Sequence, residues 1–225
     1  IAVTPGAVRS LTLQGYSVGI GNVGLTTALL ASFALDFEAG TIYGDAVVGG
    51  TADLADNVDF AYGGSLFSAT PIDFTTAHAT VSTLCSNLAA LPAPTVTGSN
   101  VVTLSGTDPL FNAFKMSAAT LDAATNLVFD VPPTSSVLVI VTGTPVAMTN
   151  MGFETGGIPA GRILYTMCDA LELTISGAGP RGSILAPNAD VDFNAGLLTG
   201  QLIANSLSGN GQVDLAPFEG CLELP

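Results

Sequence analysis

Hydrophobic residues recur at helical spacing in one stretch of the chain. The repeated positions are four and three residues apart, and Pro92 ends the pattern. They are Ala77, Val81, Leu84, Leu88 and Leu91. Asp73 stands where an N-cap would begin the helix. We therefore expect one long amphipathic helix over about residues 73–91, and a less regular version of the pattern predicts a second helix over residues 25–37.

Most other hydrophobic positions form short runs of β-branched and apolar residues, separated by Gly, Asn, Asp and Pro. This punctuation is typical of turns between strands. The pair Pro132 and Pro133 lies between two such runs and cannot donate to a β-ladder, so it indicates a bend or an edge. The pattern predicts a mainly β protein.

An internal repeat gives the strongest indication of architecture. Residues 182–188 are matched 18 residues later by residues 200–206, and residues 44–50 form a third copy. Each copy begins with Gly, contains three apolar residues, and is followed by a second short strand. The second strands are expected at residues 190–193, 212–215 and 57–60. A unit this short cannot bury its own core and fits one coil of a β-solenoid. The alternative is a β-sandwich in which the repeats are coincidental.

The repeat residues also carry a resemblance to a known family. Residues 182–189, 200–204 and 217–220 resemble the C-terminal signature of choice-of-anchor A domains, a family of adhesive surface proteins. Residues 44–50 and 71–74 resemble that family's N-terminal rung and the start of its helix. The same Gly-apolar-apolar-Ala units are similar to the discontinuous β-solenoid of microbial ice-binding proteins.

The resemblance implies a right-handed β-solenoid (β-helix) with one long flanking α-helix, exported from the cell. It supplies no catalytic residues. We expect a single solenoid domain over residues 25–225, preceded by an N-terminal strand segment over residues 1–24 that has no counterpart in the family.

Charge excludes several classes of partner. The chain has 4 Lys and Arg residues against 18 Asp and Glu residues, for a net charge of -14. Nucleic acids and anionic membranes both need a basic surface, which this composition cannot supply. The longest strand-like apolar run, residues 135–142, is too short to cross a bilayer. The start at Ile1 without Met favours a processed, extracellular product, either secreted or held at the cell surface.

The scarcity of charge predicts assembly. Charged residues make up 10% of the chain, and a compact monomer would carry about one charge per 430 Å² of surface. We expect other copies of the chain to cover part of this neutral surface, with the N-terminal strand segment adding to a neighbour's sheet. The candidate contact residues are Ala7, Val8, Leu11, Leu13, Tyr16, Val18 and Ile20.

The three cysteines predict no zinc site, because they have no CxxC spacing. One disulfide at most can form, and Cys168 with Cys221 is the expected pair since both lie in the strand-rich C-terminal half. His78, the single histidine, is seven residues from Cys85. Two helical turns hold such residues about 10.5 Å apart along the axis, too far for a catalytic pair. We assign no catalytic residue and no cofactor, and expect the protein not to be an enzyme.

Acidic residues offer a weak metal site. Asp53, Asp56 and Asp59 are candidates for calcium, but their spacing matches no known calcium loop, and a turn with solvent-facing strand positions explains them better. Asp190 and Asp192 form a second acidic group. The absence of Trp disfavours a sugar-stacking cleft, and the repeats contain no strict Thr-x-Thr array of the kind expected for ice binding.

These observations favour an extracellular structural or adhesive protein that assembles into a fibre, layer or coat, with a surface or glycan as its ligand. One alternative is a monomeric ice-binding or surface-binding domain. A second is a carbohydrate-active enzyme built on a β-helix.

Overall fold

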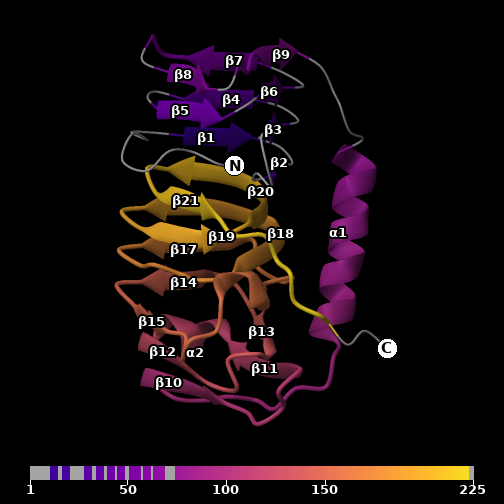
Figure 1. The fold of residues 1–225 in the computed structure, drawn as a ribbon, viewed down its shortest axis with the longest axis vertical. Coiled ribbons are helices and arrows are strands. Elements are labelled where there is room, and N and C mark those ends of the chain that lie inside the picture. Colours follow the sequence, from indigo (N-terminus) through magenta and orange to yellow (C-terminus); the bar gives the residue numbers. More distant parts are fainter. Residues whose placement is uncertain are drawn as a thin grey trace.

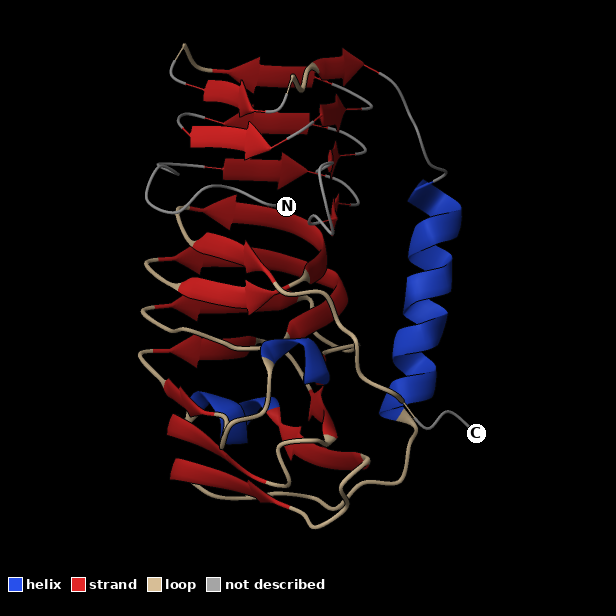
Figure 2. Cartoon of the chain, viewed as in Figure 1, coloured by secondary structure: helices blue, strands red, loops and turns tan. Residues whose placement is uncertain are grey.

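The computed structural model describes nine short segments of the N-terminal third and one continuous stretch of the remainder. These are residues 11–14, 17–20, 28–31, 34–37, 40–43, 45–48, 51–56, 58–61, 63–68 and 74–222. Strands dominate, and they curl into coils that stack into a tall column with one long helix beside it (Figures 1 and 2). The expectation of a mainly β protein is confirmed.

The strands of successive coils form three faces of the column. Face A contains β11 (Phe111–Ser117), β13 (Ser136–Thr142), β16 (Ile163–Thr166), the first parts of β18 (Ser183–Asn194) and β20 (Leu202–Gly209), then β2 (Ser17–Ile20), β3 (Ala28–Ala31), β6 (Asp45–Val48) and β9 (Leu66–Ser68). Face B contains β14 (Val146–Thr149), β17 (Glu172–Ser176), the second parts of β18 and β20, then β1 (Leu11–Gln14), β4 (Ala34–Phe37) and β7 (Thr51–Leu54). The long strands β18 and β20 turn the corner between the two faces.

Face C is divided into three separate sheets. These are β10 (Asn100–Ser105) with β12 (Ala124–Asp130) and β15 (Gly152–Glu154), then β19 (Leu197–Gly200) with β21 (Gln212–Leu215), and β5 (Gly40–Tyr43) with β8 (Val58–Ala61). Within each sheet the strands pair in parallel. A 3₁₀ turn, η1 (Ala160–Arg162), leads into β16.

The sequence repeat corresponds to neighbouring coils. Ile184 pairs with Leu202 and Ala186 with Ala204, so the copies at 182–188 and 200–206 lie side by side, as expected. The expected second strands at residues 190–193, 212–215 and 57–60 are present within β18, as β21 and as β8. They are not equivalent between the copies: Asp190 pairs with Ser206 in the same long strand pair, whereas residues 212–215 pair with β19 on face C. The first of these repeats contains β18, which turns a corner from face A to face B, and then β19 on face C, so one repeat covers three faces of the column.

The N-terminal strands run against the direction of their neighbours. β2 pairs antiparallel with β20 and β3, and β1 pairs antiparallel with β20 and β4, so both join the coils of residues 28–68 to those of the C-terminal part. The candidate contact residues Leu11 and Leu13 lie on β1, and Val18 and Ile20 on β2. Ala7, Val8 and Tyr16 lie outside the described residues. Contact of all seven candidate residues with another copy of the chain remains a prediction.

Alternation along the strands fills the interior. On face B, Leu173, Ile175, Val191 and Phe193 point inward and are at most 2% exposed, while their chain neighbours point outward. This period of two is what β-geometry requires of a half-buried strand. The inward residues of successive coils form one continuous hydrophobic core along the column.

The helix expected over about 73–91 is present as α1 (Phe74–Ala89) and runs along the outside of face A (Figure 1). Asp73, the expected N-cap, lies outside the described residues. The second predicted helix, over residues 25–37, is wrong, because β3 and β4 occupy this region and pair in parallel with β6 and β7. Tertiary pairing overrides a local helical pattern here. A short helix that the sequence did not predict, α2 (Ala118–Asp122), is capped by the Ser117 hydroxyl, which accepts from Thr120 N.

Candidate binding face

Within the described residues, face B is a continuous face of the column that the long helix α1 does not cover. On face A, α1 packs over the outer side of the sheet through Cys85 and Leu88, and Phe218 and Leu222 from the C-terminal region join the same outer cluster. Face C is broken into three sheets. Along face B, by contrast, β14, β17, β18, β20, β1, β4 and β7 form one uninterrupted set of paired strands.

Polar side chains stand in register on the outer side of face B. One row across the strands contains Glu172, Asp190 and Ser206, and the next contains Ala147, Thr174, Asp192 and Ser208. A third row contains Thr149, Ser176 and Asn194. Neighbouring strands lie about 4.8 Å apart and alternate residues about 7 Å apart along a strand. The outer side is therefore a flat lattice of hydroxyl, amide and carboxylate groups.

Hydrogen bonds between these side chains hold part of the lattice in place. Asp190 Oδ1 accepts from Asn205 Nδ2 at 2.8 Å and from Ser206 Oγ at 2.6 Å. Asp192 Oδ1 accepts from Asn194 Nδ2 at 2.6 Å. Side chains that are already ordered lose less entropy when they bind a partner. The face is therefore organised for contact before any ligand arrives.

The lattice is acidic. Glu172 and Asp190 lie opposite each other on neighbouring strands, and Asp192 is two residues further along. The three basic residues within 74–222 lie elsewhere: Lys115 on β11, Arg162 in η1, and Arg181 beside β19, where it forms a bridge with Thr199 on face C. Face B therefore presents hydrogen-bond acceptors with negative charge, and among the residues of this stretch no Lys or Arg offsets it.

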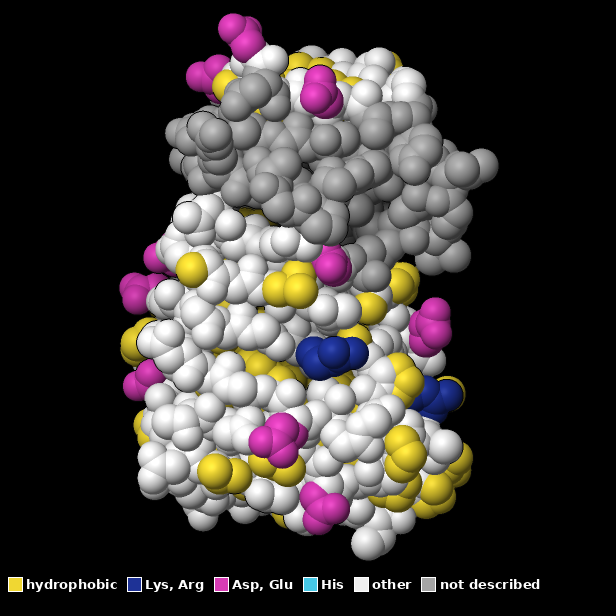
Figure 3. Space-filling model, turned by 60° about the vertical axis from the view of Figure 1, so that its left-hand side comes forward, with side chains coloured by type: hydrophobic (Ala, Val, Ile, Leu, Met, Phe, Trp, Pro, Cys, Tyr) yellow, Lys and Arg dark blue, Asp and Glu magenta, His cyan; other side chains and the backbone are white. Residues whose placement is uncertain are grey.

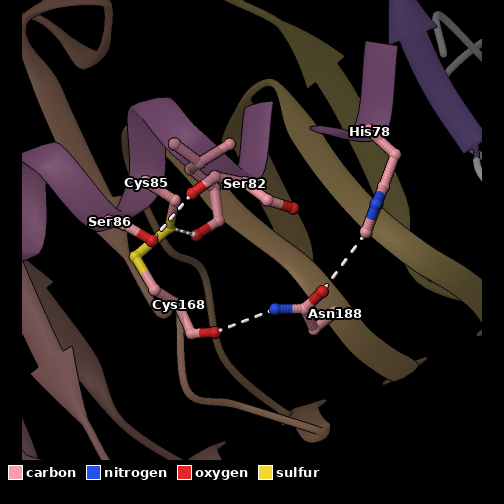
Figure 4. The surroundings of a disulfide bond; sticks show 7 residues. His78, Ser82, Cys85, Ser86, Cys168 and Asn188 are labelled. Carbon is pink, nitrogen blue, oxygen red and sulfur yellow. Dashed lines mark hydrogen bonds between the residues drawn. A yellow bond between two sulfur atoms is a disulfide. The ribbon is translucent and has the colours of Figure 1, made fainter. Parts of the chain in front are cut away.

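The disulfide was paired wrongly from the sequence. Cys85 on α1 bonds to Cys168, which follows β16 (Figure 4). Cys221 is a free, exposed thiol. The expected bond between Cys168 and Cys221 assumed that closeness in sequence reflects closeness in space. The helix instead crosses β16 and β18, which brings Cys85 against the loop after β16. The bond fastens α1 to face A.

His78 belongs to the same attachment. Its Nε2 atom lies 3.2 Å from Pro187 O and 3.2 Å from Asn188 Oδ1, and Asn188 Nδ2 donates to Cys168 O at 3.1 Å (Figure 4). Cys85 is committed to the disulfide, so it is not available as a nucleophile. These contacts give His78 a structural role that links the helix to the corner of β18.

The calcium candidates do not come together. Asp53 lies on β7 of face B, Asp59 on β8 of face C, and Asp56 in the turn between them, and all three are exposed. Within the part of the chain that the structure describes, no three His, Cys, Asp or Glu side chains are grouped closely enough to hold a metal ion.

A cleft of about 540 Å³ lies near the C-terminal end of α1, between Pro92, Gly106 and Phe111. Its carboxylate is Asp108, whose Oδ1 atom accepts from Leu110 N at 2.8 Å and Phe111 N at 3.3 Å. Asn112 Nδ2 donates to Asp108 O at 2.7 Å and to Ser135 Oγ at 2.8 Å. The polar groups of this cleft therefore stabilise the loop that forms it, and they include no pair of carboxylates.

Sequence reasoning noted Asp190 and Asp192 but missed the face to which they belong. The signal was the alternation over residues 190–194, where polar and apolar residues follow each other one by one. Thr174 and Glu172 show the same alternation on β17. What could not be read was the register that places these two strands side by side.

The fold and the open face are those of a surface-binding β-protein. The chain belongs to the family described as "Putative Ice-binding-like adhesive domain", which it matches over residues 5–215. This membership confirms the resemblance to adhesive and ice-binding proteins found in the sequence. No curated protein is similar enough in sequence to count as a match.

Solved structures give weaker likenesses. An ice-binding protein from the Antarctic ascomycete Antarctomyces psychrotrophicus is 17% identical, with 91% of this chain and 100% of that chain covered and a TM-score of 0.39. An ice-binding protein from an Antarctic biological consortium is 18% identical, with 90% and 89% covered and a TM-score of 0.41. A glycosylated ice-binding protein from an Arctic yeast is 16% identical, with 93% and 98% covered and a TM-score of 0.38.

A membrane-spanning role for a helix finds no support: among the described helices, none has both the length and the hydrophobicity needed to cross a bilayer.

Proposed function

We propose that this chain is a non-enzymatic, extracellular adhesive domain that binds an extended surface through face B. The observation that carries the proposal is the uninterrupted row of face B strands with polar side chains in register, while the long helix of the described chain, α1, packs on face A instead. Membership in an adhesive domain family supports the same role. We further propose that the column is a right-handed β-solenoid, since parallel strands connected within one sheet cross over with this hand in about 98% of cases.

The chemistry of face B favours a surface rich in hydroxyl groups, such as a glycan layer. Carboxylate and amide oxygens accept hydrogen bonds from hydroxyl groups, and charge-assisted bonds of this kind are the stronger ones. Asp190, Asp192 and Glu172 supply the carboxylates, and Thr174 supplies a hydroxyl between them. A flat lattice meets many such groups at once, so weak individual bonds add up through avidity.

Ice is the second candidate ligand. The family description and the exposed Thr149 and Thr174 side chains favour it. The carboxylates of Glu172, Asp190 and Asp192 weigh against it, because each must give up tightly held water to lie flat against an ice surface. We therefore place the glycan surface first.

Copies of the domain are also proposed to assemble into a fibre, layer or coat by strand addition. The low content of charged residues, 10%, supports this. β1 and β2 pair with β20 within one chain, and an exchange of these strands between chains would preserve the same pairings. Deletion of residues 1–20, which removes β1 and β2, followed by light scattering and electron microscopy tests the idea. Unchanged assemblies, or a full chain that remains monomeric at high concentration, would overturn it.

The experiment that tests face B is a binding assay with one bulky substitution on each of two faces. Thr174→Tyr places a ring in the centre of the face B lattice, and we expect it to weaken adhesion to a polysaccharide-coated surface at least 10-fold. Thr103→Tyr, at an exposed position of β10 on face C, is the matched control and should bind as the unaltered chain does. Equal binding by both variants would refute the assignment of face B.

The same two variants decide between the ligands. Inhibition of ice recrystallisation that is lost in Thr174→Tyr but retained in Thr103→Tyr, together with no adhesion to polysaccharide, would show that ice is the ligand of face B. Circular dichroism spectra of the variants confirm that both fold.

A further inference from the structure

The last coil of the N-terminal part leaves the end of the core open. It consists of β7, β8 and β9, and within the described residues each of these strands pairs on one side, with β4, β5 and β6 respectively. Their other edges carry backbone groups that no neighbouring strand of the described chain uses. We call β7, β8 and β9 together the open end; it lies at the top of Figure 1.

Inward side chains at the open end are incompletely buried. Leu66 pairs with Ala46, a core residue that is 0% exposed, and so occupies an inward position, yet Leu66 is 42% exposed. Leu54, Val58 and Phe60 pack against the core but are also only partly buried. Most other residues of this core are at most 8% exposed. One more layer of chain would cover these four side chains.

Within the residues that the structure describes, no strand pairs with the outer edge of β9. Ala46 N donates to Ser65 O at 3.0 Å. In a parallel ladder, successive residues of a strand direct their backbone N–H and C=O groups alternately toward the two neighbouring sides. Those of Leu66 therefore point away from β6. These groups face the unpaired edge of β9. An extended segment can bind such an edge through main-chain hydrogen bonds and place its alternate side chains over the core.

Charge identifies the kind of segment that fits. Asp53, Asp56 and Asp59 are exposed around the open end, and Figure 3 shows acidic side chains there beside hydrophobic ones. The sequence contains no Lys or Arg between Arg9 and Lys115. An added strand that pairs with β7 or β8 would place its outward side chains next to Asp53 or Asp59, where opposite charges stabilise and like charges destabilise.

We propose that the open end binds an extended segment of a partner protein in which apolar residues alternate with Lys or Arg. The segment follows the edges of β7, β8 and β9 in turn, so that its apolar residues cover Leu54, Phe60 and Leu66 and its basic residues lie beside Asp53 and Asp59. A second copy of this chain, with a net charge of -14, fits less well because its outward side chains would add more negative charge. This docking site shares β7 with face B, but it lies at the end of the column, away from the lattice of Glu172, Asp190 and Asp192 on β17 and β18. It does not depend on the function proposed for that lattice.

Two synthetic peptides test the proposal directly. The first alternates Val and Lys over 18 residues, the length of chain from Thr51 in β7 to Ser68 in β9, and the second alternates Val and Glu over the same length. We expect the Val-Lys peptide to bind the full chain with an affinity that falls as salt is added, and to slow amide hydrogen exchange in β7, β8 and β9. The Val-Glu peptide should bind at least 10-fold more weakly.

Variants locate the site. Leu66→Pro removes the outward N–H and should weaken Val-Lys binding at least 10-fold, whereas Leu66→Val keeps it and should bind nearly normally. The double variant Asp53→Asn/Asp59→Asn should also weaken binding about 10-fold, while Asp122→Asn, an exposed acid on α2, is the matched control. Thermal unfolding curves show which variants fold.

Three results would overturn the proposal. The first is that the Val-Lys peptide neither binds nor protects the three strands. The second is equal binding to the unaltered chain, Leu66→Pro and Asp53→Asn/Asp59→Asn, which would indicate attraction to the acidic chain in general. The third is protection of β7–β9 that rises with the concentration of the chain alone, which would show that a second copy occupies the open end.

Discussion

The two ends of the column are built from the same kind of coil but are finished differently. At the end formed by β10 and β11, which we call the closed end, Leu104 is 0% exposed and Phe114 is 2% exposed. At the open end Leu66, also an inward residue, is 42% exposed. The difference lies in chain outside the coils. Thr95 bridges to Lys115 at the edge of β11, Val96 packs against the core, and α2 contacts β14 at the end of face B.

The comparison teaches that stacking alone does not complete a repeat protein. Each coil buries the one beside it, but the last coil needs a cap of different sequence or a partner. Here the cap contains Pro92 and Pro94, which lack the N–H group that a ladder needs. The closed end therefore lacks a backbone edge that could pair with the open end of another copy. Assembly, if it occurs by strand addition, must use other strands than those at the two ends.

The largest expected effect concerns the helix that runs alongside the column. The disulfide between Cys85 and Cys168 closes a loop with a sequence separation of 83, and loss of such a bond costs about 4 kcal/mol in the free energy of unfolding. Cys85→Ala/Cys168→Ala should show this loss in denaturant unfolding. Hydrogen exchange should become faster in α1 and stay slow in β10 and β12. Equal acceleration in all of these elements would mean that the bond stabilises the whole core instead of the attachment of the helix.

A matched pair of leucines measures the difference between the ends directly. Leu104→Ala removes a fully buried side chain at the closed end and should cost about 3 kcal/mol. Leu54→Ala removes a partly buried inward side chain at the open end and should cost about 1 kcal/mol, because less apolar area is withdrawn from water there. Denaturant unfolding of both variants is the measurement. Equal losses would mean that the open end is covered in solution.

Much of the architecture could be predicted because it depends on short-range patterns of apolar residues and Gly in the sequence. The period of four and three residues gave α1, and the Gly-apolar repeat gave the neighbouring strands β18 and β20. The helix predicted over residues 25–37 was wrong because their apolar spacing suits a helix, whereas pairing with β6 and β7 makes them strands. The path of a repeat over three faces was not predicted, because nothing in the repeat sequence marks the second turn.

The candidate site was harder to predict than the fold. Asp190 and Asp192 stand out in the sequence, but their neighbours Glu172 and Thr174 are close in space through register alone. The disulfide pairing was predicted wrongly for the same reason, since Cys85 and Cys168 meet only where the helix packs against the sheet. The contrast between the ends depends on which coil is last, and a repeat pattern carries no information about that.

Tyr165, in the middle of the column, provides an internal reference for a completely closed core. It is 0% exposed, its hydroxyl donates to Arg181 O at 3.2 Å, and Phe129 and Phe153 pack edge-on to its ring. Burial raises the pKa of Tyr165 above its ordinary value. The unfolded chain therefore loses this proton first as pH rises through about 10, and the free energy of unfolding should fall by about 1.4 kcal/mol per pH unit above that point.

Tyr165→Phe tests this reference. The variant should lose the part of the alkaline decline that Tyr165 contributes, while keeping the packing of the ring against Phe129 and Phe153. Unfolding curves between pH 9 and pH 11 are the measurement. Parallel declines in the variant and the unaltered chain would show that Tyr165 ionises in the folded state and that the middle of the column admits water.

The smallest effect comes from a pair of isosteric changes on face C. Val102 on β10 is 1% exposed at the closed end, whereas Val58 on β8 is a partly buried inward residue at the open end. Val102→Thr buries a hydroxyl among apolar side chains and should cost about 1.5 kcal/mol. Val58→Thr keeps its hydroxyl within reach of water and should cost less than about 0.5 kcal/mol, since a solvated hydroxyl needs no protein partner. If a saturating Val-Lys peptide covers the open end, the cost of Val58→Thr in its presence should rise toward that of Val102→Thr. A cost that stays unchanged would mean that the peptide binds without sealing the core, because the side chain at position 58 would still be in contact with water.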